Sequence, residues 1–190
     1  MPSRSRQDWA DVRARSLNGL LAAHRSLGGT GRGRRFATQQ VNYAYAVLLS
    51  SQFQGFCRDL HSESVEYLTQ GIHPVALRSS CSDAYKRSRR LDHGNPNPGN
   101  IGADFDALGL TFWPKVLSLS PRNKIRRDRL EELNQWRNAI AHQDFSRFRT
   151  GPRLRLGRVE AWRKACNQLT RAFDEVMRVH IGNITGSHPW

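Results

Sequence analysis

Arg137, Asn138 and His142 have the side-chain types that proton transfer at a phosphate requires. Histidine carries protons near neutral pH because its ordinary pKa is about 6.5. Arginine stays charged and offers parallel N–H donors to phosphate oxygens. On a helix, Asn138 would share a face with His142 and could orient either the ring or a substrate. These types favour metal-independent cleavage of RNA, in which a base takes the 2′-hydroxyl proton, an acid protonates the leaving 5′-oxygen and a cation stabilises the phosphate.

The spacing of Arg137 and His142 limits what a single chain can do. Five residues correspond to about 140° around an α-helix, so one straight helix does not direct both side chains at one phosphate. A two-fold dimer in which two helix ends meet removes this difficulty, because each copy supplies what the other lacks. On spacing alone, the more frequent interpretation is an exposed arginine and a histidine that closes a helix. Asp144 is a candidate for holding the His142 ring.

The elements that must position these residues are predicted to be helical throughout. Apolar residues recur at three- and four-residue steps, and no useful length of sequence alternates as a strand would. The predicted helices cover residues 7–27, 38–70, 74–91, 101–108, 121–142 and 158–181. Ser120 is expected to cap the helix that carries the motif, with Pro121 at its first position. We therefore expect an all-α fold, a bundle of five to six helices.

Turn-forming residues divide the chain. The segment 92–100 is predicted to be a loop, and the glycine-rich segment 28–35 a flexible basic linker, since it lacks the ending of a phosphate-binding loop. The expected organisation is an N-terminal helix with its linker in residues 1–35, a helical domain in residues 36–182 and a tail in residues 183–190.

The chain is strongly basic, with 30 Lys and Arg against 16 Asp and Glu and a formal net charge of +14. Such a charge attracts phosphate backbones and acidic surfaces, although GC-rich codons would also favour arginine. Arginines precede and follow the motif, and the candidates for substrate binding are Arg126, Arg127, Arg147 and Arg149. The alternative interpretation is a solvated basic face.

Other features exclude several classes of protein. Cys57, Cys81 and Cys166 are far apart and form no CxxC pair, so neither a zinc site nor a disulfide framework is predicted. We expect no cofactor and no metal. There is no apolar run that could cross a bilayer, and residues 1–9 lack the apolar stretch of a secretory signal. These features favour a cytoplasmic protein without a membrane partner.

Residues 133–142, with the sequence LNQWRNAIAH, resemble the signature of the HEPN superfamily: an arginine, a polar residue and, a few residues later, a histidine. Three other stretches resemble its RiboL-PSP-HEPN branch. They are residues 47–60, residues 100–110 followed by Trp113, and residues 157–159 followed by Trp162. The resemblance spans roughly residues 38–179, and the order of its parts matches.

This resemblance implies a HEPN-like helical homodimer with a composite active site between the two motif-bearing helices. It implies a metal-independent endoribonuclease that acts on single-stranded RNA, with Arg137, Asn138 and His142 as catalytic residues. Such proteins are often toxins of toxin–antitoxin systems or phage-defence effectors, so an antitoxin protein is a possible partner. Many relatives carry an acidic residue where this chain has Gln52 and Gln54.

Two alternatives remain open. Some members of the superfamily have lost activity and bind RNA or a protein partner instead. A helical DNA-binding regulator would also be basic, although no clear helix-turn-helix signature is present.

Overall fold

The computed structural model describes residues 1–27, 35–149 and 151–190, and only the backbone of Arg35. Every regular element in these ranges is a helix, and no strand occurs in them, which confirms the predicted all-α class. The linker predicted at residues 28–35 lies, except for its last residue, outside the described part of the chain.

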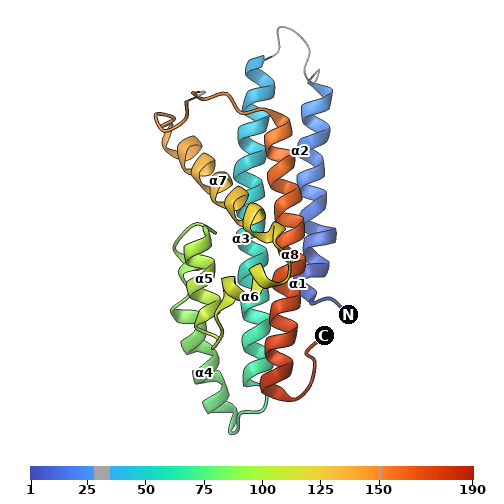
Figure 1. Cartoon of the computed structure of the whole chain (residues 1–190), viewed down its shortest axis with the longest axis vertical. Coiled ribbons are helices and arrows are strands. Elements are labelled where there is room, and N and C mark those ends of the chain that lie inside the picture. The colour runs from blue at the N-terminus through green and yellow to red at the C-terminus, as the bar shows by residue number, and fades with distance from the viewer. Residues whose placement is uncertain (28–34, 150) are drawn as a thin grey trace.

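Long helices form the body of the molecule. In Figure 1, α2, α3 and α8 run side by side, α7 runs obliquely across α3 and α8, and α4 and α5 lie on one side, while α6 contacts α5, α7 and α8. The elements are α1 (Arg4–Asp8), the π-helical turn η1 (Trp9–Arg13), α2 (Ala14–Ser26), α3 (Arg35–Thr69), α4 (Val75–Arg87), the 3-10 turn η2 (Arg90–Asp92), α5 (Pro98–Asp106), α6 (Phe112–Ser118), α7 (Arg122–His142) and α8 (Leu156–Thr185).

The core is rich in aromatic rings, and α3 lies at its centre. Phe53 of α3 is fully buried and packs against Phe173 of α8, with 5.9 Å between the ring centroids. Phe112 packs against the same Phe173 at 4.8 Å and stacks on Phe105 at 4.4 Å. These contacts join α3, α5, α6 and α8, because large rings bury much apolar area and favour such edge and offset arrangements. Trp9 and Leu17 from the N-terminal helices belong to the same core.

The described residues contain a helix that the sequence does not predict. Residues 112–118, expected to be a connection, form α6. This helix is short, and the side chain of Thr111 just before it makes no capping hydrogen bond, so it carries few helix signals. Pro114 is tolerated because it lies in the first turn. The helix forms because Phe112 and Val116 are fully buried against the core, which is a tertiary effect.

Helix boundaries also differ from the predictions. The N-terminal helix starts at Arg4 and includes a π-helical turn that begins at the buried Trp9. The helix predicted for residues 74–91 ends at Arg87. The reason lies in Asp104, whose carboxylate accepts hydrogen bonds from Arg90 N at 2.7 Å and Leu91 N at 2.9 Å and thereby fixes these residues in η2. Helix α8 extends beyond both predicted ends.

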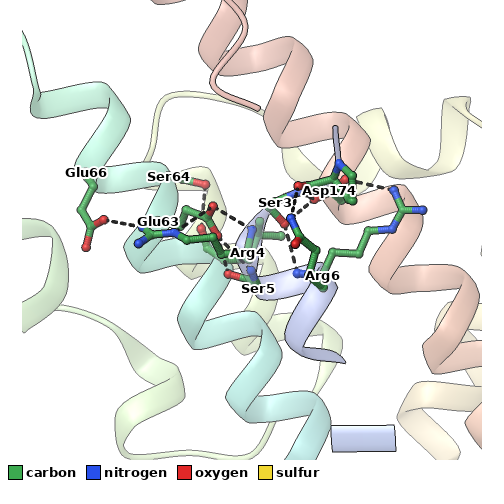
Figure 2. Close-up of polar contacts among 11 residues, drawn as sticks. Ser3, Arg4, Ser5, Arg6, Glu63, Ser64, Glu66 and Asp174 are labelled. Atoms are coloured by element: carbon green, nitrogen blue, oxygen red, sulfur yellow. Dashed lines mark hydrogen bonds and ion pairs between the residues drawn. The ribbon is translucent and has the colours of Figure 1, made fainter. Parts of the chain in front are cut away.

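The N-terminus of α1 is held by carboxylates from two other helices (Figure 2). Glu63 of α3 is 5% exposed and accepts hydrogen bonds from Arg4 N at 3.0 Å, Ser5 N at 3.1 Å and Ser5 Oγ at 2.7 Å. These contacts satisfy N–H groups that the start of a helix otherwise leaves without partners.

Asp174 of α8 binds Ser3, which precedes α1, and Arg6 within α1. Its carboxylate accepts from Ser3 N at 3.0 Å, from Ser3 Oγ and from Arg6 Nη1 at 3.2 Å. The N-terminal helix is therefore tied to α3 and α8 through buried charge-assisted hydrogen bonds. Among the described residues, none of the helices has the length and apolar character needed to span a membrane.

Candidate functional site

All three motif residues lie on α7, whose ends are fixed by identifiable contacts. Ser120 Oγ accepts from Arg122 N at 3.3 Å, so it serves the start of the helix as predicted, although the helix begins at Arg122. At the other end, Gln143 adopts a left-handed conformation with φ of 55°. Asp144 N then donates to Ala139 O at 3.1 Å. This reversal ends the helix at His142.

Trp136 sets the rotation of α7 about its own axis. Its side chain is fully buried, stacks on Phe148 at 4.2 Å between ring centroids and contacts Trp162 of α8 at 6.3 Å. With this side of the helix facing inward, Arg137 and Asn138 lie half-buried at the edge of the core, and His142 is exposed. The structure therefore places the three predicted residues on the accessible side of α7.

Arg137 is a half-buried cation without an acidic partner in the described ranges of the chain. Its Nη1 donates to the neutral amide oxygen of Asn138 at 3.2 Å. By contrast, the mostly buried Arg89 is paired with Asp92 at 3.0 Å. The charge of Arg137 is thus held in place but not neutralised, which is the state that an anion-binding arginine requires.

Asn138 has a second partner that the sequence analysis missed. Asn95, in the loop before α5, donates from Nδ2 to Asn138 Oδ1 at 2.6 Å. In the sequence, Asn95 is distinguished only as one of the turn-forming residues of the predicted loop 92–100. The hydrogen bonds of Asn138 in the described residues go to Asn95 and Arg137, not to the His142 ring.

His142 is exposed, and its ring makes no hydrogen bond within the residues that the structure describes. The Asp144 carboxylate, considered as its partner, instead accepts from Ser146 N at 3.0 Å. These bonds from Ser146 lower the pKa of the Asp144 carboxyl, and the nearby Arg147 and His142 lower it further. The ring is therefore accessible to a substrate or to another chain.

Arg147 and Arg149 lie exposed on the loop that follows His142, and this loop is folded against α3. Phe145 stacks on Tyr43 at 5.6 Å, and Phe148 stacks on Trp136. Further along the loop, its backbone is bound by three α3 side chains: Tyr43 Oη and Gln39 Nε2 donate to Pro152 O, and Asn42 Nδ2 donates to Leu154 O. The two arginines are thus carried on an anchored segment beside the end of α7.

Arg126 and Arg127 lie at the opposite end of α7. Since a helix rises about 1.5 Å per residue, Arg126 is about 24 Å from His142 along the axis. Arg126 Nη1 donates to Asn123 Oδ1 at 2.6 Å, and burial lowers its pKa, followed by repulsion from Arg122. Arg127 lies over the Trp113 ring at 5.8 Å. Within one chain, these candidate residues are therefore not grouped with the motif.

At the C-terminal end of α7, Arg137 has the chemistry to bind an anion and His142 has the chemistry to move a proton. The described part of the chain contains no group of side chains that could hold a metal ion. No family model matches the chain, and neither the curated proteins nor the solved structures contain a significant match.

Proposed function

We propose that this protein is a metal-independent endoribonuclease of the HEPN type that cleaves single-stranded RNA and acts as a toxin or phage-defence effector. The observation that carries the proposal is Arg137, a half-buried guanidinium with only a neutral hydrogen-bond partner among the described residues. Burying a cation without a counter-ion is unfavourable, so the site gains free energy when a phosphate supplies the missing charge.

Each motif residue has a role in this proposal. Arg137 stabilises the charge that develops on the phosphate, and His142 acts as the acid or the base. Asn138 uses its oxygen for Asn95 and Arg137, so the N–H groups of its amide remain for a substrate oxygen. Arg147 and Arg149 bind the RNA backbone on the anchored loop.

The complete site requires a second copy of the chain. The segment from Arg137 to His142 is continuous helix, so the two side chains diverge by about 140° on one copy. A two-fold dimer through the ends of α7 would place Arg137 of one protomer beside His142 of the other and create two equivalent composite sites. An acidic antitoxin protein could cover this basic surface.

A second candidate function is an inactive HEPN-like module that binds RNA or a protein. The exposed ring of His142 makes no hydrogen bond among the described residues, which favours the inactive module. A catalytic histidine often has a hydrogen-bond partner that fixes its tautomer. Wild-type activity distinguishes the two functions.

The purified protein is expected to cut single-stranded RNA in EDTA and to leave a 2′,3′-cyclic phosphate end. Arg137→Ala and His142→Ala should each lower the rate by about 100-fold or more while the circular dichroism spectrum stays unchanged. RNA binding without cleavage would favour the inactive module. Activity that disappears in EDTA, or that persists in both variants, would contradict the proposed mechanism.

A further inference from the structure

The loop between η2 and α5 reaches α7 at the proposed site. Asn95 of this loop donates from Nδ2 to Asn138 Oδ1 at 2.6 Å, across a separation of 43 residues in the sequence. The same oxygen accepts from Arg137 Nη1 at 3.2 Å. Asn138 thus connects the loop to the guanidinium of Arg137.

The chemistry of the donors fixes the direction of these hydrogen bonds. A guanidinium only donates, so Asn138 must turn its oxygen, rather than its nitrogen, toward Arg137. Because that oxygen also faces Asn95, Asn95 must present its amide nitrogen. Both lone pairs of Asn138 Oδ1 are then used, and the amide cannot rotate without breaking two contacts.

Three helices hold the loop in place. Gln54 of α3 donates to Leu91 O at 2.6 Å and to Gly94 O at 2.9 Å. Asn100 Nδ2 of α5 donates to Asn95 O at 2.9 Å, and Asn134 of α7, only 2% exposed, donates to Pro96 O at 2.9 Å. The position of Asn95 is therefore determined by the fold and not by the loop alone.

All these holding groups are neutral amides. A carboxylate in the place of Asn138 or Asn95 would pair with Arg137 and compete with a bound phosphate. The amides orient the guanidinium while its charge stays available.

We infer that Asn95 is a positioning residue of the site, which acts through Asn138 to orient Arg137. The inference rests on the proposed function for its effect on cleavage, but the orientation itself is a property of the folded chain. Loss of Asn95 frees the Asn138 amide to rotate, and Arg137 loses its fixed acceptor. Misplacement of about 1 Å can lower a catalytic rate by up to about 100-fold.

A double-mutant cycle tests this connection through cleavage rates. Asn95→Ala is expected to lower kcat by about 10-fold or more with little change in KM, since the orientation matters most in the transition state. In the Asn138→Ala background the same substitution should have no further effect, because the link is already broken. The matched control is His93→Ala, an exposed change in the same loop, which should leave the rate unchanged. Equal losses in both backgrounds would contradict the inference.

A second readout does not depend on activity. In ¹⁵N-labelled protein, the guanidinium N–H resonances of Arg137 should be visible in wild type and His93→Ala, and broadened by exchange in Asn95→Ala. Asn95→Asp keeps the side-chain size and should also change them, because it removes the donor to Asn138 Oδ1. Unchanged Arg137 resonances in both Asn95 variants would overturn the inference, whatever the cleavage rates. If these resonances respond but wild type does not cut RNA, the proposed function fails and the positioning role stands.

Discussion

Arg137 Nη1 donates to Asn138 Oδ1, the side chain of its immediate neighbour, at 3.2 Å. Adjacent residues on a helix normally point in different directions, so this contact draws the guanidinium along the helix surface instead of outward into solvent. The acceptor is neutral and shared with Asn95. Arg137 is thus oriented without losing its charge, and its remaining N–H donors can meet a phosphate.

Replacement of Arg137 by lysine separates the effect of charge from that of geometry. Arg137→Lys keeps the cation but loses the planar fork, so the cleavage rate should fall by about 10- to 100-fold. Arg137→Ala should fall further. The measurement is single-turnover cleavage of one RNA by both variants. A lysine variant as active as wild type would show that only the charge is needed.

The anchored loop is expected to bind the RNA backbone. In the His142→Ala background, which prevents cleavage, the double change Arg147→Ala and Arg149→Ala should weaken binding of single-stranded RNA. If each arginine contacts one phosphate, the slope of log K against log salt concentration should become shallower by about 1.4.

The matched control for the loop changes Arg15 and Arg25, two exposed arginines of α2, on the other side of the molecule from the end of α7 (Figure 1). Fluorescence anisotropy at a series of salt concentrations measures both double variants. An equal loss of affinity in the control would show that net charge alone, and not the loop, binds RNA.

His61 makes the stability of the fold depend on pH. It is buried against Phe105, and burial, with a smaller effect of Arg89, lowers its pKa to about 4. Between about pH 6.5 and that value the unfolded chain binds a proton that the folded chain does not. The free energy of unfolding should therefore fall as the pH drops through this window, by about 3 kcal/mol in total.

Urea unfolding at pH 7 and pH 4 measures this effect. His61→Phe should reduce the difference in the free energy of unfolding between pH 7 and pH 4 by about this amount. His93→Gln, a change at an exposed residue, should leave that difference unchanged. A His61→Phe variant with the same pH dependence as wild type would contradict the assignment.

The hydrogen bonds from the start of α1 to the Glu63 carboxylate should contribute measurably to stability. Glu63→Gln replaces an acceptor oxygen by an N–H donor that faces the donors of Arg4 and Ser5, which should cost about 1–3 kcal/mol. Glu66→Gln is the matched control on the same helix, because Glu66 is exposed and its carboxylate is paired with the exposed Arg4. Glu66→Gln should lower the free energy of unfolding by less than about 0.5 kcal/mol. Thermal unfolding compares the two variants, and an equal loss of stability in both would contradict the assigned role of Glu63.

The sequence predicts the long helices well because their apolar residues follow the helical period and bury a continuous face. Phe53, Leu60 and Trp136, for example, are fully buried. Helix α6 was missed because it is stabilised by the packing of Phe112 on Phe105 of α5 and on Phe173 of α8, which is distant in the sequence.

The same limit applies to the candidate site. Arg137, Asn138 and His142 could be selected from residue type and spacing within one helix. The partner Asn95 could not, because a contact between a loop and a helix 43 residues apart leaves no periodic signal. An asparagine in a turn is explained well enough by the turn itself. Similarly, the hydrogen bond of the Asp144 carboxylate to Ser146 depends on how the chain reverses after His142.

The proposed composite site combines Arg137 of one protomer with His142 of the other. Mixing two inactive proteins, Arg137→Ala and His142→Ala, under conditions that allow subunits to exchange tests this arrangement. About half of the dimers are then mixed, and each mixed dimer has one intact composite site of two. RNA cleavage should therefore return to about a quarter of the wild-type rate. If both groups acted within one chain, every mixed dimer would be inactive, and a mixture without activity would contradict a composite site.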